Sequence, residues 1–337
     1  MSAGVRVGVV GAGYWGKNLV RNFYEIEDAE LVIVCDKDRS RLESISERYP
    51  DTEVTDKFQN LLERKDVDAV VIVTPAVFHH AQAREALMAG KHVFVEKPMS
   101  MSMKEATELK DLASTGGVML MVGHLLIYHP AVRKLRELIT NGELGEVYYL
   151  YSQRVNLGRI RKDENALWSF APHDVSVILY LLGEEPETVT ATGECYLQDG
   201  IEDVVFLHMK FPDRKMAQVQ LSWLDPHKER KLTVVGSRKM AVFDDVLASE
   251  KIRIYDKGID RPPEYGSYGE YLTLRDGDIM IPRIDMKEPL RVECEHFINC
   301  VRRGERPLTD AESGVRVVRV IEAAQLSLGK RGIPIEM

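Results

Sequence analysis

The stretch from Val5 to Gly16 reads VRVGVVGAGYWG and sets the architecture of the first part of the chain. A β-rich run, Val5–Val10, leads through glycines at positions 11, 13 and 16 into a predicted helix, Gly16–Ile26. Glycines at this spacing let the backbone approach a pyrophosphate, while the helix N-terminus faces its negative charge. The pattern predicts a dinucleotide-binding turn, whose expected contact residues are Gly11, Gly13, Tyr14, Trp15 and Gly16.

An acidic residue stands where the second strand of such a unit would end. Asp36 directly follows the apolar run Leu31–Cys35. Its carboxylate can accept hydrogen bonds from both ribose hydroxyls of NAD and would repel the additional phosphate of NADP. Lys37 and Arg39 flank it and could partly neutralise its charge. We therefore predict NAD, with NADP less favoured, and count Asp36 and Lys37 among the cofactor-binding residues; the alternative is a tight turn followed by a surface aspartate.

Strands and helices alternate over the first third of the chain. The predicted strands are apolar throughout, which is typical of a parallel sheet covered on both faces. They are Val5–Val10, Leu31–Cys35, Ala69–Val73, His92–Val95 and Val118–Val122, and the helices between them include Arg39–Tyr49, Phe58–Arg64, Phe78–Ala89 and Lys104–Thr115. The predicted fold class is α/β, with an N-terminal Rossmann domain, a doubly wound parallel sheet, at residues 1–122.

Beyond Gly123 the pattern changes to consecutive β-type runs joined by turns, which suggests a largely antiparallel sheet. The runs are Glu146–Arg154, Thr188–Tyr196, Val204–Phe211, Met216–Trp223, Lys231–Val235 and Ala241–Asp244. Predicted helices are Pro130–Asn141, Asp174–Leu182, Glu293–Arg303 and Ala311–Leu328. Residues Tyr255–Pro289, rich in Gly, Pro, Asp and Tyr, are expected to form a long loop or flap. We predict a second α/β domain with an open, mostly antiparallel sheet at residues 123–337.

Composition narrows the classes of partner and location. The 337 residues carry a formal net charge of −8 with both signs mixed along the chain, which argues against nucleic acid as a partner. The sequence shows no secretory leader pattern and no apolar run long enough to cross a bilayer. The four cysteines have neither CxxC nor Cys/His metal spacing. We expect a cytoplasmic protein with reduced thiols, no membrane partner and no metal.

Two polar segments follow predicted strands of the first domain. Thr74-Pro75 ends the third strand and Glu96-Lys97-Pro98 ends the fourth. Ligands of open α/β sheets bind beyond the carboxyl ends of the strands, so both segments are expected to face the cofactor. A lysine at this edge could hydrogen-bond a sugar hydroxyl and help to move its proton. The alternative for Lys97 is a solvated loop lysine.

The run from Thr74-Pro75 through His79 to the segment AGKHVFVEKP at residues 89–98 resembles the glucose–fructose oxidoreductase/inositol dehydrogenase (Gfo/Idh/MocA) family. The glycine turn and the domain order agree. The resemblance implies a Rossmann domain followed by an α/β domain with an open, mostly antiparallel sheet. It also implies that Lys97 lies near the nicotinamide and the reacting carbinol. The resemblance places Glu96 near the nicotinamide ribose. Cofactor contacts are also expected from Thr74 and Pro75 after the third strand, from His79, and from His124 after the fifth strand.

The family's second catalytic element is a histidine before a helix that ends in Leu-x-Gly, and APHDVSVILYLLG at residues 171–183 matches it. Pro172 suits the first helical position, so His173 is expected in the first turn, where the helix dipole disfavours imidazolium. A neutral imidazole can take a proton from an alcohol; the alternative is a buried structural histidine. Ser169 stands where many members carry Asp. Asp174 could substitute for it, or could simply stabilise the helix dipole.

Further matches resemble a branch of the family that acts on nucleotide sugars and includes UDP-N-acetylglucosamine 3-dehydrogenases. They are Gly13–Gly16, Leu167-Trp168 and Ser222–Lys228. A basic segment, RVNLGRIRK at residues 154–162, could pair with a diphosphate, or could be a solvated loop. The expected substrate contacts are Lys97, Arg154, Asn156, Arg159, Trp168 and His173.

The function predicted from these residues is NAD-dependent oxidation of a nucleotide-sugar hydroxyl to a ketone, with Lys97 and His173 handling the proton. Alternatives are a dehydrogenase of a free sugar or inositol, and a keto-sugar reductase. A non-catalytic NAD-binding regulator is least favoured. The resemblance also implies a homodimer or homotetramer formed through the C-terminal sheet. Alternating apolar residues fit either such a face or the domain's own core: Val204, Phe206, Val219 and Leu221.

Overall fold

The computed structural model describes residues 4–158, 160–162, 164–260 and 273–337. The chain divides into two compact units. The first comprises Met1–Tyr128 and Lys287–Glu322, and the second comprises His129–Met286 and Ala323–Met337. The units differ from the sequence-based limits, 1–122 and 123–337, mainly because Lys287–Glu322 returns to the first unit.

Aromatic packing explains why this late segment joins the first unit. Helix α8 (Pro289–Arg303) places Phe297 against Phe23 and Phe94, with ring centroids 6.2 and 5.7 Å away. All three rings are fully buried. Burying a large apolar side chain contributes roughly 1.5–3 kcal/mol, so these contacts hold α8 on the first unit.

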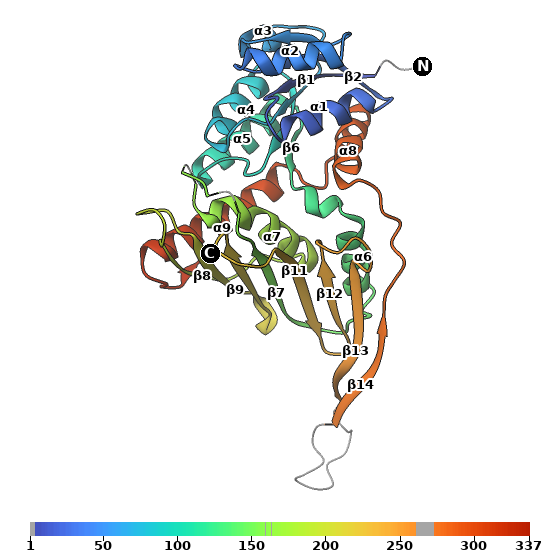
Figure 1. The fold of residues 1–337 in the computed structure, drawn as a ribbon, viewed down its shortest axis with the longest axis vertical. Coiled ribbons are helices and arrows are strands. Elements are labelled where there is room, and N and C mark those ends of the chain that lie inside the picture. The colour runs from blue at the N-terminus through green and yellow to red at the C-terminus, as the bar shows by residue number, and fades with distance from the viewer. Residues whose placement is uncertain (1–3, 159, 163, 261–272) are drawn as a thin grey trace. The chain divides into compact units, whose positions relative to one another are not determined.

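The first unit is built on a six-stranded parallel sheet in the order β3-β2-β1-β4-β5-β6 (Figure 1). The strands are β1 (Val5–Val10), β2 (Ala29–Cys35), β3 (Glu53–Thr55), β4 (Ala69–Ile72), β5 (His92–Glu96) and β6 (Leu120–Gly123). This is the strand order of a Rossmann fold, so the predicted class is confirmed. Strand β3 was not predicted, because its three residues are partly exposed and carry no apolar run.

Helices cover both faces of this sheet. They are α1 (Gly16–Glu25), α2 (Arg39–Arg48), α3 (Phe58–Leu62), α4 (His79–Met88), α5 (Met103–Gly116) and α8, with short 3₁₀ turns η1 (Ala76–Phe78) and η2 (Leu125–Tyr128). Helices α4 and α5 lie side by side, as do α1 and α8 (Figure 1). Because both faces are covered, β4 is buried along its whole length, as its apolar sequence predicts.

The second unit contains a nine-stranded sheet in the order β14-β13-β12-β11-β7-β10-β9-β8-β15. Strands β7 and β10 pair in parallel, and the other pairs described are antiparallel. The mostly antiparallel sheet is therefore confirmed. The strands are β7 (Val147–Val155), β8 (Thr188–Glu194), β9 (Val204–Lys210), β10 (Met216–Ser222), β11 (Glu229–Gly236), β12 (Met240–Asp244), β13 (Ile252–Asp260), β14 (Thr273–Met280) and β15 (Ile335–Glu336).

Helices pack on one face of this second sheet. They include α6 (Pro130–Thr140) and α7 (Ala166–Leu182), and α7 contacts β7, β9 and β10. Helix α9 (Ala311–Gly329) belongs to the first unit through Glu322 and to the second from Ala323. Val219 and Leu221 point into the covered face and are fully buried, whereas Phe206 is exposed on the opposite face. A further 3₁₀ turn, η3 (Pro212–Arg214), connects β9 and β10.

The long loop predicted for Tyr255–Pro289 is wrong in part. The structure continues β13 to Asp260, forms β14 at Thr273–Met280 and begins α8 at Pro289. The two strands pair antiparallel at the edge of the sheet (Figure 1). Glycine and aspartate are unfavourable in strands, so the composition of this segment did not predict β13 and β14. Pairing of β13 with the neighbouring strand β12 stabilises them.

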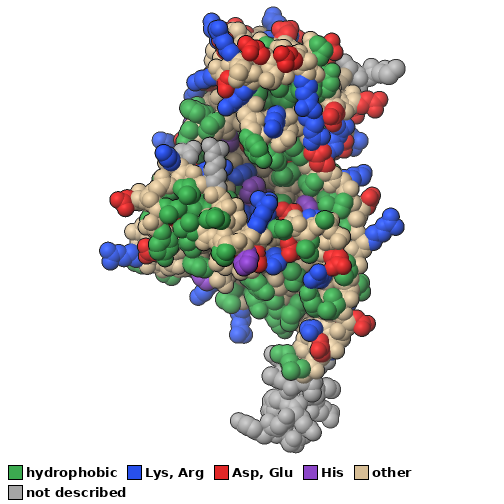
Figure 2. Space-filling model, in the orientation of Figure 1, with side chains coloured by type: hydrophobic (Ala, Val, Ile, Leu, Met, Phe, Trp, Pro, Cys, Tyr) green, Lys and Arg blue, Asp and Glu red, His purple; other side chains and the backbone are tan. Residues whose placement is uncertain are grey.

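Lys, Arg, Asp and Glu side chains are interspersed over the face of the molecule drawn in Figure 2. Within the described ranges, no helix combines the length and the apolar character that crossing a bilayer requires.

Candidate active site

The glycine turn leaves no room for side chains. Gly11 has a φ of +100°, and a Cβ there would lie 2.8 Å from the carbonyl oxygen of Val73. At Gly16 a Cβ would overlap the Gly11 carbonyl oxygen. Trp15, the N-cap of α1, makes no side-chain capping bond to the first helical turn. The turn therefore offers backbone space beside a helix N-terminus that no side chain caps, which suits a pyrophosphate.

Asp36 is fixed against this turn at the end of β2. Its Oδ2 accepts a 2.6 Å hydrogen bond from the Ala12 backbone N–H, and its Oδ1 accepts one of 2.9 Å from the Asp38 N–H. Only 9% of the residue is exposed. The carboxylate thus has a set orientation beside the turn, as recognition of a ribose requires. The residues present fit a dinucleotide.

A basic residue that the sequence analysis missed lies beside Asp36. Arg41, in the first turn of α2, places Nη1 3.4 Å from Asp36 Oδ2 and Nε 3.2 Å from Asp38 Oδ2. Lys37 instead lies over the Phe78 ring, 5.8 Å from its centroid, and Arg39 faces Asp56 at 3.8 Å. Arg41 could have been predicted from the sequence, because it lies one helical turn after Asp38, the N-cap of α2.

His79 braces the two polar segments that follow β4 and β5. Its Nε2 lies 2.7 Å from the Thr74 carbonyl oxygen, and its Nδ1 lies 2.8 Å from that of Pro98. Thr74 Oγ1 donates a 2.5 Å hydrogen bond to Gln82, while Pro75 caps the η1 turn. Burial lowers the pKa of His79, with both carbonyl contacts opposing the shift. Only 1% of His79 is exposed, so its buried ring holds the backbone of Thr74 and Pro98 in place.

Glu96 is held by the glycine turn. Its Oε1 accepts a 2.6 Å hydrogen bond from the indole Nε1–H of Trp15, and its Oε2 accepts one of 3.2 Å from the Lys97 backbone N–H. Burial raises the pKa of Glu96, opposed by the Trp15 bond and by the charge of Lys97. A Cβ at Gly123 would lie 3.2 Å from the Glu96 carboxyl group, a tight contact that a larger residue here could relieve only by shifting that side chain.

His124 is the second histidine near Lys97. It is 1% exposed, and within the described part of the chain neither ring nitrogen has a hydrogen-bond partner. Burial, aided by the charge of Lys97, lowers the pKa of His124 to about 3. The ring is therefore neutral at any physiological pH, with one nitrogen able to donate and the other to accept. Lys97, His79, Glu96 and His124 thus gather at the carboxyl ends of β4, β5 and β6.

The second unit places His173 differently from the sequence prediction. Helix α7 begins at Ala166, where the Asn165 side chain accepts the Trp168 N–H at 3.1 Å, so Pro172 lies inside the helix and not at its start. The expected first-turn position of His173 is wrong, and the dipole argument for its neutrality does not apply. The cap at Asn165 explains the earlier start.

Asp174 forms a buried ion pair. Its Oδ2 lies 2.5 Å from Arg154 Nε, and its Oδ1 accepts a 2.6 Å bond from Ser152 Oγ. Arg154 and Asp174 are 8% and 6% exposed. The alternative of a helix-dipole role for Asp174 is wrong, because Asp174 lies far from the helix start. The ion pair also ties Arg154 of β7 to Asp174, the residue that follows His173 in α7.

Arg230 was not predicted and lies opposite Arg154 in the antiparallel pair of β11 and β7. Its Nη1 lies 3.9 Å from Asp245 Oδ2, and the other oxygen of that carboxylate, Oδ1, lies 3.9 Å from Lys251 Nζ. Partial burial and the charge of Arg154 lower the pKa of Arg230. Since 43% of its side chain is exposed, Arg230 presents an incompletely neutralised guanidinium to solvent.

Three further residues were predicted to contact the substrate: Trp168, Asn156 and Arg159. Trp168 is 7% exposed in α7, and Asn156 follows β7 with its N–H donated to the Ser222 carbonyl at 3.1 Å. Arg159 lies outside the described residues.

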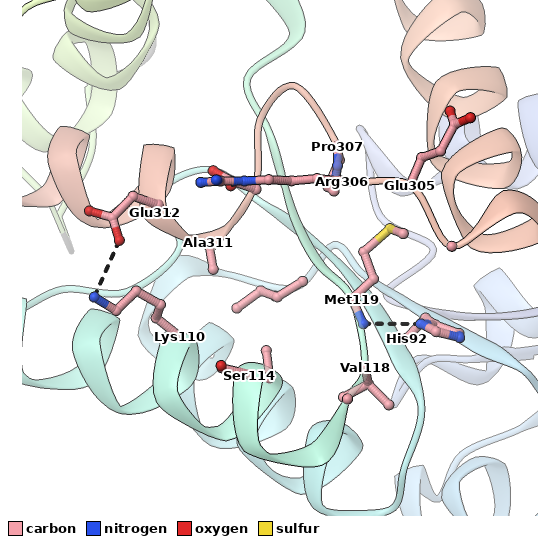
Figure 3. Close-up of a pocket in the computed structure, with 15 residues that line it drawn as sticks. His92, Lys110, Ser114, Val118, Met119, Glu305, Arg306, Pro307, Ala311 and Glu312 are labelled. Carbon is pink, nitrogen blue, oxygen red and sulfur yellow. Dashed lines mark hydrogen bonds and ion pairs between the residues drawn. The ribbon is translucent and has the colours of Figure 1, made fainter.

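A separate cavity of about 450 Å³ lies at the amino ends of β5 and β6, away from the carboxyl ends just described (Figure 3). In it Lys110 pairs with Glu312 at 3.2 Å, and His92 Nδ1 accepts the Met119 N–H at 3.0 Å. Arg306 pairs with Asp310 in the same cavity. Because its basic side chains are paired with carboxylates, we assign the cavity no ligand.

The strand order, the glycine turn and the fixed Asp36 define an NAD-binding oxidoreductase of the Rossmann class. Residues 5–124 match the model of the oxidoreductase family with an NAD-binding Rossmann fold, and residues 132–242 match the GFO/IDH/MocA C-terminal domain. The chain belongs to the Gfo/Idh/MocA oxidoreductase family.

Its relatives act on several substrates. UDP-N-acetylglucosamine 3-dehydrogenase of Acidithiobacillus ferrooxidans is 27% identical over 93% of this chain and 94% of its own. A solved structure of that enzyme aligns with a TM-score of 0.82 at 25% identity, covering 96% of this chain and 98% of the other. The NAD-dependent scyllo-inositol 2-dehydrogenase of Bacillus subtilis is 25% identical over 99% and 96% of the two chains. The 2,7-anhydro-N-acetylneuraminate hydratase of Mediterraneibacter gnavus is 30% identical over 63% of this chain and 60% of its own.

Proposed function

We propose that the protein oxidises a hydroxyl of a nucleotide sugar to a ketone with NAD, and that this group is the 3-hydroxyl of UDP-N-acetylglucosamine. The similarity to the Acidithiobacillus dehydrogenase over nearly the whole chain supports the proposal. Bound NAD would accept the hydride from the carbinol carbon. The protein's own residues must then orient the sugar and remove the hydroxyl proton.

Lys97 and His173 are proposed to handle that proton. Lys97 follows β5 directly after Glu96, whose carboxyl group is held by Trp15 and the Lys97 backbone. This anchoring fixes the backbone that carries the lysine, as near-attack geometry requires. His124, neutral and buried near Lys97, is proposed to face the cofactor, with Thr74, Pro75 and His79 ordering the same edge.

The observation that carries the choice of a nucleotide sugar is the cross-strand pair of Arg154 and Arg230. Like charges directly opposite each other on paired strands repel. Asp174 forms a close ion pair with Arg154 but not with Arg230. A diphosphate would supply the missing negative charge, and arginine pairs with phosphate in bidentate fashion. A free polyol would leave Arg230 unused.

The proposed position of oxidation is tested by isotope transfer. UDP-N-acetylglucosamine carrying deuterium at C3 should yield singly deuterated NADH, whereas deuterium at C4 should stay in the sugar. Transfer from another carbon would overturn the choice of the 3-hydroxyl. Transfer only from inositol or a free hexose would establish the free-sugar dehydrogenase instead, and reaction only with a keto sugar and NADH would establish the reductase.

The outer face of the second sheet supports a homodimer or homotetramer. Tyr149 and Tyr151 stack there with ring centroids 6.3 Å apart, and Phe206 and Met216 are exposed beside them. Apolar patches of this kind commonly bind a partner surface. Light scattering of the wild type and of Tyr151→Glu tests the proposal: the wild type should be oligomeric and the variant smaller. We propose a cytoplasmic location on the basis of the sequence alone.

A further inference from the structure

Glu293 is an acidic residue in the interior of the first unit. It lies in the second turn of α8 and has 0% exposure. Neither of its carboxyl oxygens has a hydrogen-bond partner in the described part of the chain. Buried polar groups are nearly always paired, and an isolated buried carboxylate is strongly disfavoured. This carboxyl group therefore needs a physical explanation.

Its position follows from the aromatic packing of α8. Phe297, one turn later on the same face of the helix, contacts Phe94 of β5 with ring centroids 5.7 Å apart. Phe94 and Glu96 point to the same face of β5, because side chains alternate along a strand. Glu293 and Glu96 therefore project into the layer between α8 and β5. An electrostatic interaction between the two carboxyl groups agrees with this placement.

The surroundings of the two carboxyl groups differ. Glu96 accepts hydrogen bonds from Trp15 and from the Lys97 backbone, and it also interacts with the Lys97 charge. For Glu293, burial first and then the charge of Glu96 raise the pKa well above its ordinary value. Cys294, beside it in α8, is also fully buried and interacts with both carboxyl groups.

The charged groups on the other elements packed against α8 are already engaged. On α1, Arg21 pairs with Glu288 at 2.5 Å, and Glu25 lies 3.9 Å from Arg291. On η2, the Tyr128 hydroxyl lies 2.9 Å from Thr309 Oγ1. On β1, Arg6 pairs with Asp68 at 2.9 Å. None of these basic groups is among the charges that act on Glu293.

We propose that Glu293 and Glu96 form a carboxyl pair that carries one proton at neutral pH, and that the proton resides on Glu293. Two carboxyl groups that interact electrostatically in a site without solvent cannot readily both ionise. The proton leaves Glu96 as the single negative charge at this position, able to accept ribose hydroxyl groups of the cofactor. Glu293 is thus a positioning residue that acts through Glu96. This step rests on the proposed cofactor site.

The pair has a consequence for the cofactor's oxidation state. The nicotinamide ring carries a positive charge in NAD⁺ and none in NADH. A second negative charge near the ribose, gained when Glu293 ionises, would favour NAD⁺ over NADH. The ratio of the dissociation constants, NADH over NAD⁺, should therefore rise with pH in the wild type, by about tenfold between roughly pH 6 and pH 9.

The first arm of the test measures the carboxyl pair without cofactor. A carboxyl group whose pKa is raised in the folded state costs stability as pH rises from its unfolded pKa, about 4.3, toward the folded pKa. Glu293→Gln cannot ionise, so its Tm should gain on the wild type as pH rises from about 5 to about 9. Glu295→Gln, on the same helix but 45% exposed and paired with Arg291, is the matched control and should show no such trend. A Tm difference that does not change with pH would overturn the pair.

The second arm measures NAD⁺ and NADH dissociation constants by titration of the same three proteins. Glu293→Gln should flatten the pH dependence of their ratio, and Glu295→Gln should retain it. An unchanged slope in Glu293→Gln would overturn the coupling to the cofactor. If no protein binds NAD, the proposed function fails, while the stability arm still decides the pair.

Infrared spectroscopy of the wild type covers the case in which Glu293→Gln does not fold. The carbonyl stretch of a protonated carboxylic acid should persist near neutral pH, and its absence would refute the proposal.

Discussion

Trp15 and Glu96, 81 residues apart in the sequence, are joined by a 2.6 Å hydrogen bond from the indole Nε1–H to the carboxyl Oε1. The bond connects the pyrophosphate turn to the strand end that carries Lys97. One side chain can therefore influence both ends of the proposed dinucleotide site.

Replacing Trp15 by Phe removes this bond and keeps most of the ring. A hydrogen bond to a charged group contributes about 1.5–3 kcal/mol, so NAD affinity should fall roughly 10- to 100-fold. The loss should exceed that in Tyr14→Phe, whose ring is 84% exposed in the same turn. Titration of both variants with NAD measures this difference. Equal NAD affinities of the two variants would show that the Trp15 hydrogen bond to Glu96 does not contribute to cofactor binding.

Lys97→Ala should reduce kcat by a factor of about 10²–10⁴, the usual contribution of a positioned acid or base. NAD affinity should change little, because Asp36 and the glycine turn remain. Lys104→Ala, on the first turn of α5, serves as the control. Steady-state kinetics combined with NAD titration separates the two effects. Turnover within a few fold of the wild type would remove Lys97 from the chemistry.

Asp36→Ser should shift the cofactor preference toward NADP. The carboxylate that repels the 2′-phosphate is lost, while Arg41, 3.4 Å from it in the wild type, is freed to pair with that phosphate. We expect NAD affinity to fall and NADP affinity to rise by roughly tenfold each. In the double variant Asp36→Ser/Arg41→Ala, the gain for NADP should disappear. A gain that survives would show that Arg41 plays no part.

Arg230→Gln should raise KM for a nucleotide sugar by about 10- to 100-fold, since a charge-assisted bond to phosphate is lost. The effect on kcat should be small, because the residue is proposed to hold the diphosphate and not the reacting carbon. Arg253→Gln in the same sheet, paired with Glu250, is the control. Arg230→Lys should recover only part of the affinity, as lysine lacks the bidentate geometry. An unchanged KM would contradict the diphosphate contact.

Local chemistry made part of this molecule predictable. Gly11 and Gly16 are required by backbone contacts within a single strand–turn–helix, and Asp36 follows the next strand at the expected spacing. Apolar strands separated by helices gave the Rossmann sheet, and consecutive β runs gave the antiparallel one. Each of these features depends on residues near one another in the sequence.

Long-range register was not predictable in the same way. Arg230 faces Arg154 only because β11 pairs with β7, and Glu293 nears Glu96 only because α8 returns to the first unit. The position of His173 was misjudged for a local reason. Pro172 suits the first position of a helix, but Asn165 caps α7 seven residues earlier through the Trp168 N–H.

The most direct test of the proposed function compares UDP-N-acetylglucosamine with free N-acetylglucosamine, which differ only in the nucleotide diphosphate. NAD reduction is followed by absorbance, with a ketone trap to draw the reaction forward. We expect kcat/KM for UDP-N-acetylglucosamine to be at least about 10³-fold higher, because the diphosphate contacts operate in the transition state as well. Equal values, or turnover confined to free sugars and inositols, would contradict it.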